Sequence, residues 1–357
     1  MSVPGSLATT GAADVVVESL PTTSDPNATA VLLESLAATR DSQTLQVLVE
    51  NLPSGKKRVT IAGTDANVPM RQWETSYPRW LIDRIVAAKG PAWVCDEIAR
   101  DESPEYTAAA LKWALLSYLG EDRFDGARIL DFGCGAGAST VGLCKLFPTA
   151  QLVGIELEEH HLDVAKGRAE FYGFRNLEFM TSPSGVELPD GIGKFDHIVM
   201  SGVFEHLLPG ERSALMPRLW TVLKPGGVLF LRETPNRYFP METHTTGLPL
   251  LNYLPRWLVM ALVQKFGRNN ARLSWDELLR RGIRGGSIPE IRKLLPEATL
   301  LRPSRQGMDD LIDLWYASVP KRRSGRAKGY VRAAAKLVKA LGFECPPYLE
   351  LALQKNR

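Results

Sequence analysis

The sequence holds few of the residues that mark disulfide-bonded, metal-binding or membrane-spanning proteins. Its 357 residues include four cysteines and five histidines, and no Cys-x-x-Cys pair occurs. Cysteines scattered in this way, with no histidine at ligand spacing, predict a reduced, cytoplasmic protein without a zinc site. No apolar run approaches the roughly 20 residues that cross a bilayer. The first residues lack a basic stretch followed by an apolar one, so we expect no signal peptide.

Charge and composition exclude further classes. The net charge of +3 is too small to favour nucleic acid as a partner. The apolar fraction of 45% and the charged fraction of 23% are ordinary for a soluble globular protein. At this length we expect one main domain with additions. We predict a disordered leader over residues 1–28, a mostly helical extension over 29–121, and the main domain over 122–357.

One glycine-rich stretch, residues 129–140, organises the main domain. It reads Ile-Leu-Asp-Phe-Gly-Cys-Gly-Ala-Gly-Ala-Ser-Thr, with an apolar run ending at Asp131 and glycines at 133, 135 and 137. This pattern predicts a strand, a tight turn and a helix start. Glycine permits positive φ and lets a ligand lie against bare backbone, and a helix N-terminus offers unpaired N–H groups to an anionic part of the ligand. A nucleotide-like cofactor at the carboxyl end of a parallel strand is the first hypothesis.

After this turn the chain alternates between strand and helix patterns. We predict strands over 151–156, 177–181, 195–201 and 228–233, a helix over 158–172 and another over 209–223. The alternation resumes at 287–295, and a final polar–apolar alternation predicts a strand over 348–355. Such alternation indicates an α/β fold with a doubly wound, mostly parallel sheet covered on both faces. Residues 235–285 interrupt the pattern and are expected to form an inserted lid.

The glycines alone leave two cofactors open, because Gly133, Gly135 and Ala138 also fit the G-x-G-x-x-A pattern of NAD(P) sites. Asp131 argues against a dinucleotide, since a carboxylate there would repel the pyrophosphate. A cofactor that carries an ammonium and a sulfonium group would be attracted instead. NAD(P)-dependent oxidoreduction therefore remains the alternative.

Three motifs together resemble the class I, seven-stranded S-adenosylmethionine-dependent methyltransferases. They are residues 130–137, the strand pattern Phe-Asp-His-Ile-Val at 195–199, and Leu-Lys-Pro-Gly-Gly at 223–227. Their order and spacing look most like the small-molecule group that includes the ubiquinone-biosynthesis O-methyltransferases. The resemblance implies a Rossmann-like, mostly parallel seven-stranded sheet with an antiparallel last strand. It also implies S-adenosylmethionine as the cofactor and in-line methyl transfer as the reaction.

The resemblance also implies roles for matching residues. Asp131 and the glycine turn would hold the amino-acid end of the cofactor, and Glu156 would accept hydrogen bonds from its ribose hydroxyls. The acid that usually contacts adenine is missing after the third strand, so backbone groups or Ser182 are expected there. The full predicted set of cofactor-contacting residues is Asp131, Gly133, Cys134, Gly135, Gly137, Glu156, Leu157, Ser182 and Ser201.

Two histidines are candidate general bases for an acceptor hydroxyl that must lose its proton. His206 follows the fourth strand, and His244 lies in the insertion on the side where the acceptor is expected. A structural hydrogen bond is the competing interpretation of His206. Some ubiquinone-type enzymes bind a divalent metal through Glu-x-x-Glu-His, but Gly202 replaces the first acid of that motif here. Because two remaining ligands are too few, we predict no metal.

The acceptor is expected to be a small molecule, with an apolar or lipid-like one as an open option. Residues 247–267 form the most apolar stretch, which predicts a buried lid helix or, alternatively, a helix in a membrane interface. A later basic run, residues 321–339, contains no acid and predicts a solvated face, with attraction to anionic lipid as the alternative. Peripheral membrane contact and a scaffold that binds the cofactor without catalysis stay open, and the sequence predicts no oligomeric state.

Overall fold

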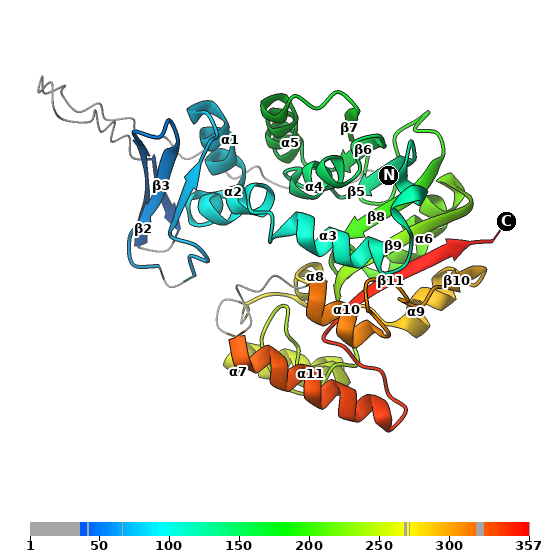
Figure 1. Cartoon of the computed structure of the whole chain (residues 1–357). Coiled ribbons are helices and arrows are strands. Elements are labelled where there is room, and N and C mark those ends of the chain that lie inside the picture. The colour runs from blue at the N-terminus through cyan, green and yellow to red at the C-terminus, as the bar shows by residue number, and fades with distance from the viewer. Residues whose placement is uncertain are drawn as a thin grey trace, which may run out of the picture. The chain divides into compact units, whose positions relative to one another are not determined.

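The computed structural model describes residues 36–40, 43–65, 67–267, 270, 272–318 and 325–356, and the predicted leader lies outside the described residues. The described chain forms two compact units that divide between Glu102 and Ser103 (Figure 1). The boundary therefore falls before the predicted start of the main domain at residue 122, because a helix that the sequence assigns to the extension belongs to the second unit.

The first unit begins with an antiparallel sheet and ends in helices. Its four strands lie in sequence order in the sheet. They are β1 (Leu36–Arg40), β2 (Gln43–Asn51), β3 (Lys57–Ala62) and β4 (Gln72–Thr75). The helices α1 (Arg79–Lys89) and α2 (Val94–Glu102) follow, joined by the short 3-10 helix η1 (Pro91–Trp93).

The mostly helical extension predicted for residues 29–121 thus needs correction over residues 36–75. Val47 and Val49 of β2 and Val59 and Ile61 of β3 are buried, so apolar residues face the core at every second position. That period of two is the strand signature. The turn between these strands contains Gly55 with a φ of +79°. Alternation on both sides of a glycine turn was the hairpin signal in this stretch.

The second unit is a seven-stranded sheet with helices on both faces. The strand order is β10-β11-β9-β8-β5-β6-β7. Strands β5, β6, β7, β8 and β9 all run parallel to one another. Strand β11 lies between β9 and β10 and is antiparallel to both. The strands are β5 (Arg128–Phe132), β6 (Gln151–Glu156), β7 (Leu177–Thr181), β8 (Phe195–Ser201), β9 (Leu223–Pro235), β10 (Ala298–Leu300) and β11 (Tyr348–Lys355). The predicted fold is confirmed, including the antiparallel last strand.

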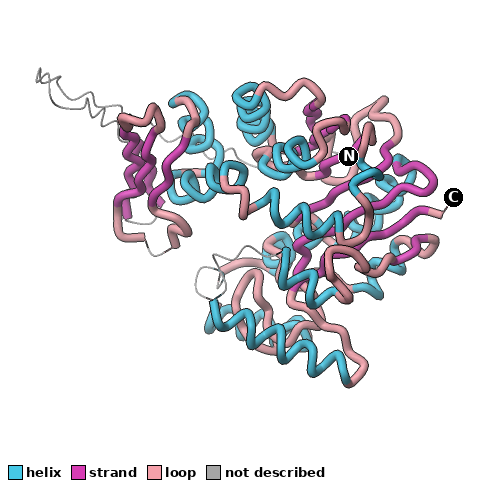
Figure 2. Tube along the Cα trace, viewed as in Figure 1, coloured by secondary structure: helices cyan, strands magenta, loops and turns pink. Residues whose placement is uncertain are grey.

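The helices of this unit connect the strands and cover them, as Figures 1 and 2 show. In chain order they are α3 (Thr107–Leu116), η2 (Glu121–Phe124), α4 (Ala138–Leu146), α5 (Glu159–Tyr172), η3 (Phe204–His206), α6 (Pro209–Val222), α9 (Ile288–Leu294), α10 (Leu311–Ser318) and α11 (Gly325–Ala340). In Figure 1, α3 and α10 lie in front of the sheet and α6 behind it. The central strands are buried over nearly their whole length, as expected for strands covered on both faces.

The insertion lies between β9 and α9 and contains η4 (Leu251–Tyr253), α7 (Arg256–Phe266) and α8 (Trp275–Arg280). It has a small apolar cluster of its own, to which α7 contributes Val259 and Val263. The opposite side of α7 is open, since Trp257 is 70% exposed and Ala261, Gln264 and Lys265 on the same side are exposed as well. Helix α7 is therefore buried on one side only, whereas the lid interpretation rested on burial around the whole helix. Among the described residues, no helix is long and apolar enough to cross a membrane.

Candidate functional site

The glycine turn after β5 has a backbone that other residues could not adopt without strain. Gly133, Gly135 and Gly137 have φ values of +70°, +53° and +85°. A Cβ at Gly133 would lie 2.5 Å from Val203, and one at Gly137 would lie 2.7 Å from the Cβ of Ala165. At Gly135 no heavy atom lies within 4 Å of that position. Two glycines are therefore required by packing, while Gly135 borders open space.

Hydrogen bonds hold the turn against the end of β6 and against α5. The amides of Gly133 and Cys134 both donate to the carbonyl of Ile155, at 2.8 and 2.9 Å. The guanidinium of Arg168, fully buried in α5, donates to the carbonyl of Ala136 at 2.7 Å. Arg168 thus supports the turn, and sequence reasoning missed it because nothing local signals that a helix residue reaches back to the turn.

Asp131 lies underneath the turn and is 1% exposed. Its Oδ2 accepts hydrogen bonds from the hydroxyls of Ser139 and Thr140, both at 2.7 Å. Burial raises the pKa of this carboxyl, and the two hydroxyl hydrogen bonds oppose that shift. The structure therefore gives Asp131 a bracing role for the first turn of α4.

Glu156 ends β6 and closes the turn from the opposite side. Its Oε2 accepts from the amide of Gly135 at 2.8 Å, and its Oε1 accepts from the amides of Leu157 and Glu158 at 2.8 and 3.3 Å. The acid and the turn thus adjoin at the carboxyl ends of two neighbouring strands, as their order implies. Leu157 beside it is 46% exposed and offers an apolar surface at the same edge.

Two other predicted residues, Cys134 and Ser182, contribute mainly to packing and local structure. Cys134 is buried, and burial raises the pKa of its thiol well above the ordinary value. The hydroxyl of Ser182 lies 2.8 Å from the carbonyls of Ser184 and Glu187, so its single proton is directed into its own loop. Adenine recognition by that hydroxyl as a donor therefore lacks support in this geometry.

Ser201 ends β8 and belongs to a buried polar group. Its hydroxyl accepts a hydrogen bond from Arg232 at 3.2 Å, and Arg232 donates to the Glu350 carboxylate at 3.2 Å. Burial raises the pKa of Glu350 to about 7. This pair joins β9 to β11 just below the edge where the predicted residues gather.

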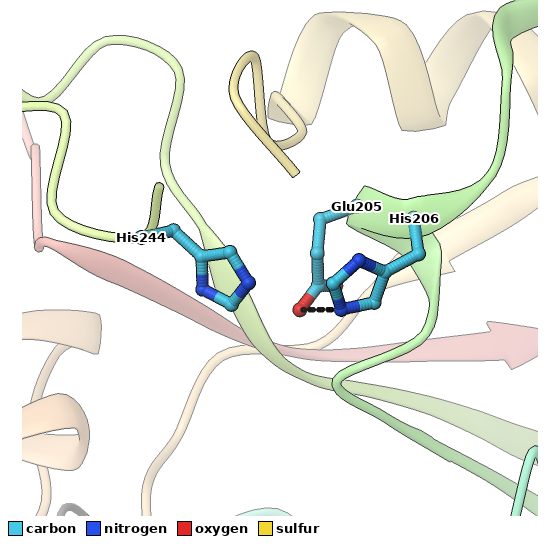
Figure 3. A group of neighbouring side chains, drawn as sticks. All are labelled: Glu205, His206 and His244. Carbon is cyan, nitrogen blue, oxygen red and sulfur yellow. Dashed lines mark ion pairs between the residues drawn. The ribbon is translucent and has the colours of Figure 1, made fainter. Parts of the chain in front are cut away.

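The two candidate bases lie together although they are far apart in sequence (Figure 3). The ring centroids of His206 and His244 are 5.3 Å apart. Nδ1 of His206 lies 2.7 Å from the carbonyl of Arg280, and Nε2 lies 3.8 Å from Oε1 of Glu205. Ligand atoms of Glu205, His206 and His244 all lie within 4.8 Å of one another. The sequence predicts no metal because it supplies two ligands, whereas the fold brings a third.

Glu205 is the buried member of this group, at 1% exposure. Among the described residues, neither carboxylate oxygen makes a hydrogen bond of normal geometry, although its own amide and the Thr234 hydroxyl lie near enough to oppose the rise of its pKa. Burial raises the pKa of Glu205 to about 8 and lowers the pKa values of His206 and His244. All three shifts favour the neutral forms of the side chains, as expected where charges lose water.

Glu242 fixes the insertion loop that carries His244. Its carboxylate, 2% exposed, accepts from the amides of His244, Thr245 and Thr246 and from the Thr246 hydroxyl. Gly282 lets a second segment of the insertion approach, since a Cβ there would lie 2.7 Å from His244 and 3.2 Å from Glu205. Both residues escaped sequence reasoning, because their partners come from distant segments.

The turn and this group adjoin through Val203. Gly133 packs against Val203, which directly precedes η3 with its Glu205 and His206. A separate hollow of about 460 Å³ lies between the insertion and α9 and contains none of the predicted site residues. Its lining includes Arg237, Tyr253 and Lys293.

Comparison with known proteins identifies the region around the turn. Residues 130–229, from β5 to β9, match the family model described as a methyltransferase domain. The chain is 34% identical over 116 residues to trans-aconitate 2-methyltransferase of Variovorax paradoxus, covering 32% of this chain and 42% of that protein. It is 30% identical over 146 residues to erythromycin 3''-O-methyltransferase of Saccharopolyspora erythraea, covering 37% and 47%.

The chain spans about half or less of the length of the curated relatives that it matches. Among solved structures, a putative sarcosine dimethylglycine methyltransferase from Galdieria sulphuraria aligns with a TM-score of 0.42 at 14% identity, over 73% of this chain and 88% of that one. The match of residues 130–229 confirms the prediction of a methyltransferase domain built around the glycine turn.

Proposed function

Because residues 130–229 match a methyltransferase domain, we propose that the protein transfers a methyl group from S-adenosylmethionine to a small molecule. The observation that carries the proposal is the open glycine turn with Glu156 against Gly135, inside the matched region. The relatives named above act on small molecules, trans-aconitate and erythromycin, which supports a small acceptor.

The residues around the turn suit this cofactor. Backbone at Gly135 borders open space, so a ligand can lie against it. Glu156 uses three of about four lone-pair positions on its carboxylate for amides, which leaves one for a ribose hydroxyl. Leu157 adds an exposed apolar side chain for a planar base. Asp131 keeps the turn in place from below.

The chain's own contribution to the reaction is positioning and proton handling. The bound cofactor supplies an activated methyl group, so the acceptor must be oriented in line with it and kept from water. His206 is suited to accept a proton, because its Nδ1 faces the Arg280 carbonyl and leaves Nε2 with a free lone pair. Burial lowers the pKa values of both His206 and His244, which keeps the imidazoles neutral and able to act as bases.

The insertion supports an apolar or lipid-like acceptor. Trp257 and Phe266 of α7, Tyr253 of η4 and Leu250 before it each expose apolar surface on the segment that also carries His244. We place the enzyme in the cytoplasm, in keeping with its four free cysteines. There this surface would touch a membrane or an apolar acceptor.

Calorimetry with S-adenosylhomocysteine and with NADH tests the proposal. We expect S-adenosylhomocysteine to bind and NADH not to bind; binding of NADH alone would favour the oxidoreductase alternative. Transfer of a radiolabelled methyl group into a host extract should then reveal the acceptor. If the cofactor binds but no extract fraction is labelled, the non-catalytic scaffold is the better description.

A pair of variants tests the histidines. His206→Ala and His244→Ala should each lower turnover while leaving S-adenosylhomocysteine affinity unchanged. His160→Ala, an exposed histidine at the start of α5, serves as the control. Full turnover in both site variants would remove the base role.

A further inference from the structure

Glu205, His206 and His244 have the chemistry of a metal site with an open position. Two imidazoles and one carboxylate converge, and their ligand atoms lie within 4.8 Å of one another (Figure 3). Three protein ligands with further positions free are typical of catalytic zinc and non-haem iron sites. Imidazole-rich sets of this kind favour divalent transition metals over Mg²⁺ and Ca²⁺, which prefer oxygen ligands.

The buried carboxylate of Glu205 is an independent reason to expect a cation. It is 1% exposed, and within the described residues its own amide and the Thr234 hydroxyl face it without making a hydrogen bond of normal geometry. An unsatisfied buried polar group of this kind is rare in native proteins and calls for an explanation such as an ion. The nearby guanidinium of Arg212 donates to the main-chain carbonyls of Glu205 and Leu207 and pairs with Glu290.

The orientation of His206 supports the same conclusion. Its Nδ1 lies 2.7 Å from the carbonyl of Arg280, so Nδ1 carries the proton in the neutral ring and Nε2 presents a lone pair toward Glu205. At 3.8 Å, Nε2 and Oε1 are too far apart for a hydrogen bond. A metal-binding histidine usually donates its other N–H to a carbonyl or carboxylate, which is the arrangement found here.

His244, the third ligand, lies in a loop held by hydrogen bonds and is exposed to solvent. Glu242 orders the loop of His244 through hydrogen bonds to three successive amides. His244 is exposed, so an ion can enter from that side. Ligand atoms about 2 Å from a tetrahedral ion stand roughly 3.3 Å apart, so ion binding would draw the three side chains closer than their present spacing of up to 4.8 Å.

We propose that Glu205, His206 and His244 bind one divalent transition-metal ion of the zinc type, with a position left open for an acceptor oxygen. Binding of the ion is independent of the proposed function; its use by the acceptor rests on that function. Bound there, the ion supplies Lewis-acid chemistry that eases loss of the acceptor's proton to solvent. With the ion bound, the histidines would aid deprotonation of the acceptor as metal ligands and not as general bases. The ion would also link the insertion to the end of β8.

Calorimetry with ZnCl₂ on the metal-free full chain tests the site. We expect about one Zn²⁺ per chain with micromolar or tighter affinity, and no comparable binding of Mg²⁺. His244→Ala and Glu205→Gln should each weaken Zn²⁺ binding by on the order of tenfold or more. His160→Ala should bind like the parent. His244→Ala changes an exposed side chain, so it decides the question even if Glu205→Gln fails to fold.

The outcomes separate the metal site from methyl transfer. Zn²⁺ affinity that is unchanged in His244→Ala, or absent in the parent, would overturn the metal site. Zn²⁺ binding without S-adenosylhomocysteine binding would support the site and count against methyl transfer. If the chain binds S-adenosylhomocysteine but not Zn²⁺, the result would support methyl transfer and count against the metal site.

Discussion

At the scale of single residues, Gly135 and Gly173 share one backbone property and differ in location. Both have positive φ, +53° and +69°, and neither has a heavy atom within 4 Å of a Cβ position. Gly135 lies in the turn after β5, whereas Gly173 caps the end of α5. Substitution by alanine therefore imposes a similar backbone strain at both, of about 1 kcal/mol. Only at Gly135 would the added methyl group occupy the proposed cofactor surface.

We predict that Gly135→Ala weakens S-adenosylhomocysteine binding by about tenfold or more, because the methyl group keeps the ligand from the backbone. Gly173→Ala should lose similar stability in denaturant unfolding and keep full affinity. Calorimetry on both variants makes the comparison. Equal affinities would place the ligand away from Gly135.

His197 gives a prediction on pH. It lies in β8 with Nε2 at 2.9 Å from the Arg123 carbonyl, among Phe124 and Phe230. Burial lowers its pKa from 6.5 to about 4. The folded state thus binds the proton less well than the unfolded state. The contribution of neutral His197 to the free energy of unfolding is complete above pH 6.5. It is lost as the pH falls toward 4, by up to about 3 kcal/mol.

His197→Gln keeps a hydrogen-bond donor and removes the titrating ring. Urea unfolding between pH 7 and pH 4 should show a shallower loss of stability for the variant than for the parent. Parallel curves for the two proteins would mean that His197 does not govern the acid response.

Residue identity was easier to predict than residue partners. The turn glycines and Glu156 follow from strand ends and sequence order, and the structure brings them to one edge. The partners of Asp131 and Ser182 could not be predicted, because each hydrogen bond depends on side-chain direction in the folded loop. The sequence points to His244 as a candidate base, but its meeting with Glu205 and His206 was beyond reach, because the path of the insertion has no pattern in the sequence.

At the scale of elements, Glu242 holds its loop by charge-assisted hydrogen bonds. Glu242→Gln leaves one acceptor oxygen and turns an amide toward the same donors. Charge-assisted bonds of this kind contribute about 2 kcal/mol, so amides 244–246 should exchange hydrogen roughly 30-fold faster. Glu277→Gln, in the exposed cap of α8, is the control and should leave them unchanged. Unaltered exchange in Glu242→Gln would show that other contacts order the loop.

The basic helix α11 shows how an element can differ from its sequence pattern. The sequence predicts a solvated basic face because no acid lies within residues 321–339. In the structure, Lys336 and Lys339 pair with Asp310 at the start of α10, and Arg332 and Lys336 pair with Asp313. These cations are therefore occupied within the fold, which weakens the alternative of attraction to anionic lipid.

The same contacts predict that α11 depends on Asp310. Burial raises the pKa of this carboxyl, but hydrogen bonds from Lys336 and Lys339 outweigh burial and lower the pKa to about 2. Asp310→Asn should lower the melting temperature and reduce its sensitivity to salt, because two ion pairs are lost. Asp309→Asn, at an exposed neighbour, should change neither. Identical melting curves for all three proteins would contradict the assigned pairing.

At the scale of the whole molecule, the parallel sheet was predictable from the sequence, whereas the first unit carried a readable signal only for the β2–β3 hairpin. Long strand–helix alternation constrains connection and handedness, so a doubly wound sheet follows from the pattern. The antiparallel sheet of the first unit rests on short strands of four to nine residues. Strands β1 and β4, of five and four residues, are too short to give a clear period, so packing between strands decides their place.

The division after Glu102 predicts that the second unit carries the cofactor site alone. Every residue proposed to hold the cofactor lies between Asp131 and Ser201, and the buried Arg232–Glu350 pair beneath that edge belongs to the same unit. A fragment of residues 103–357 should therefore unfold cooperatively and bind S-adenosylhomocysteine within about twofold of the full chain. An affinity about tenfold weaker in a folded fragment would instead assign the first unit a part in cofactor binding.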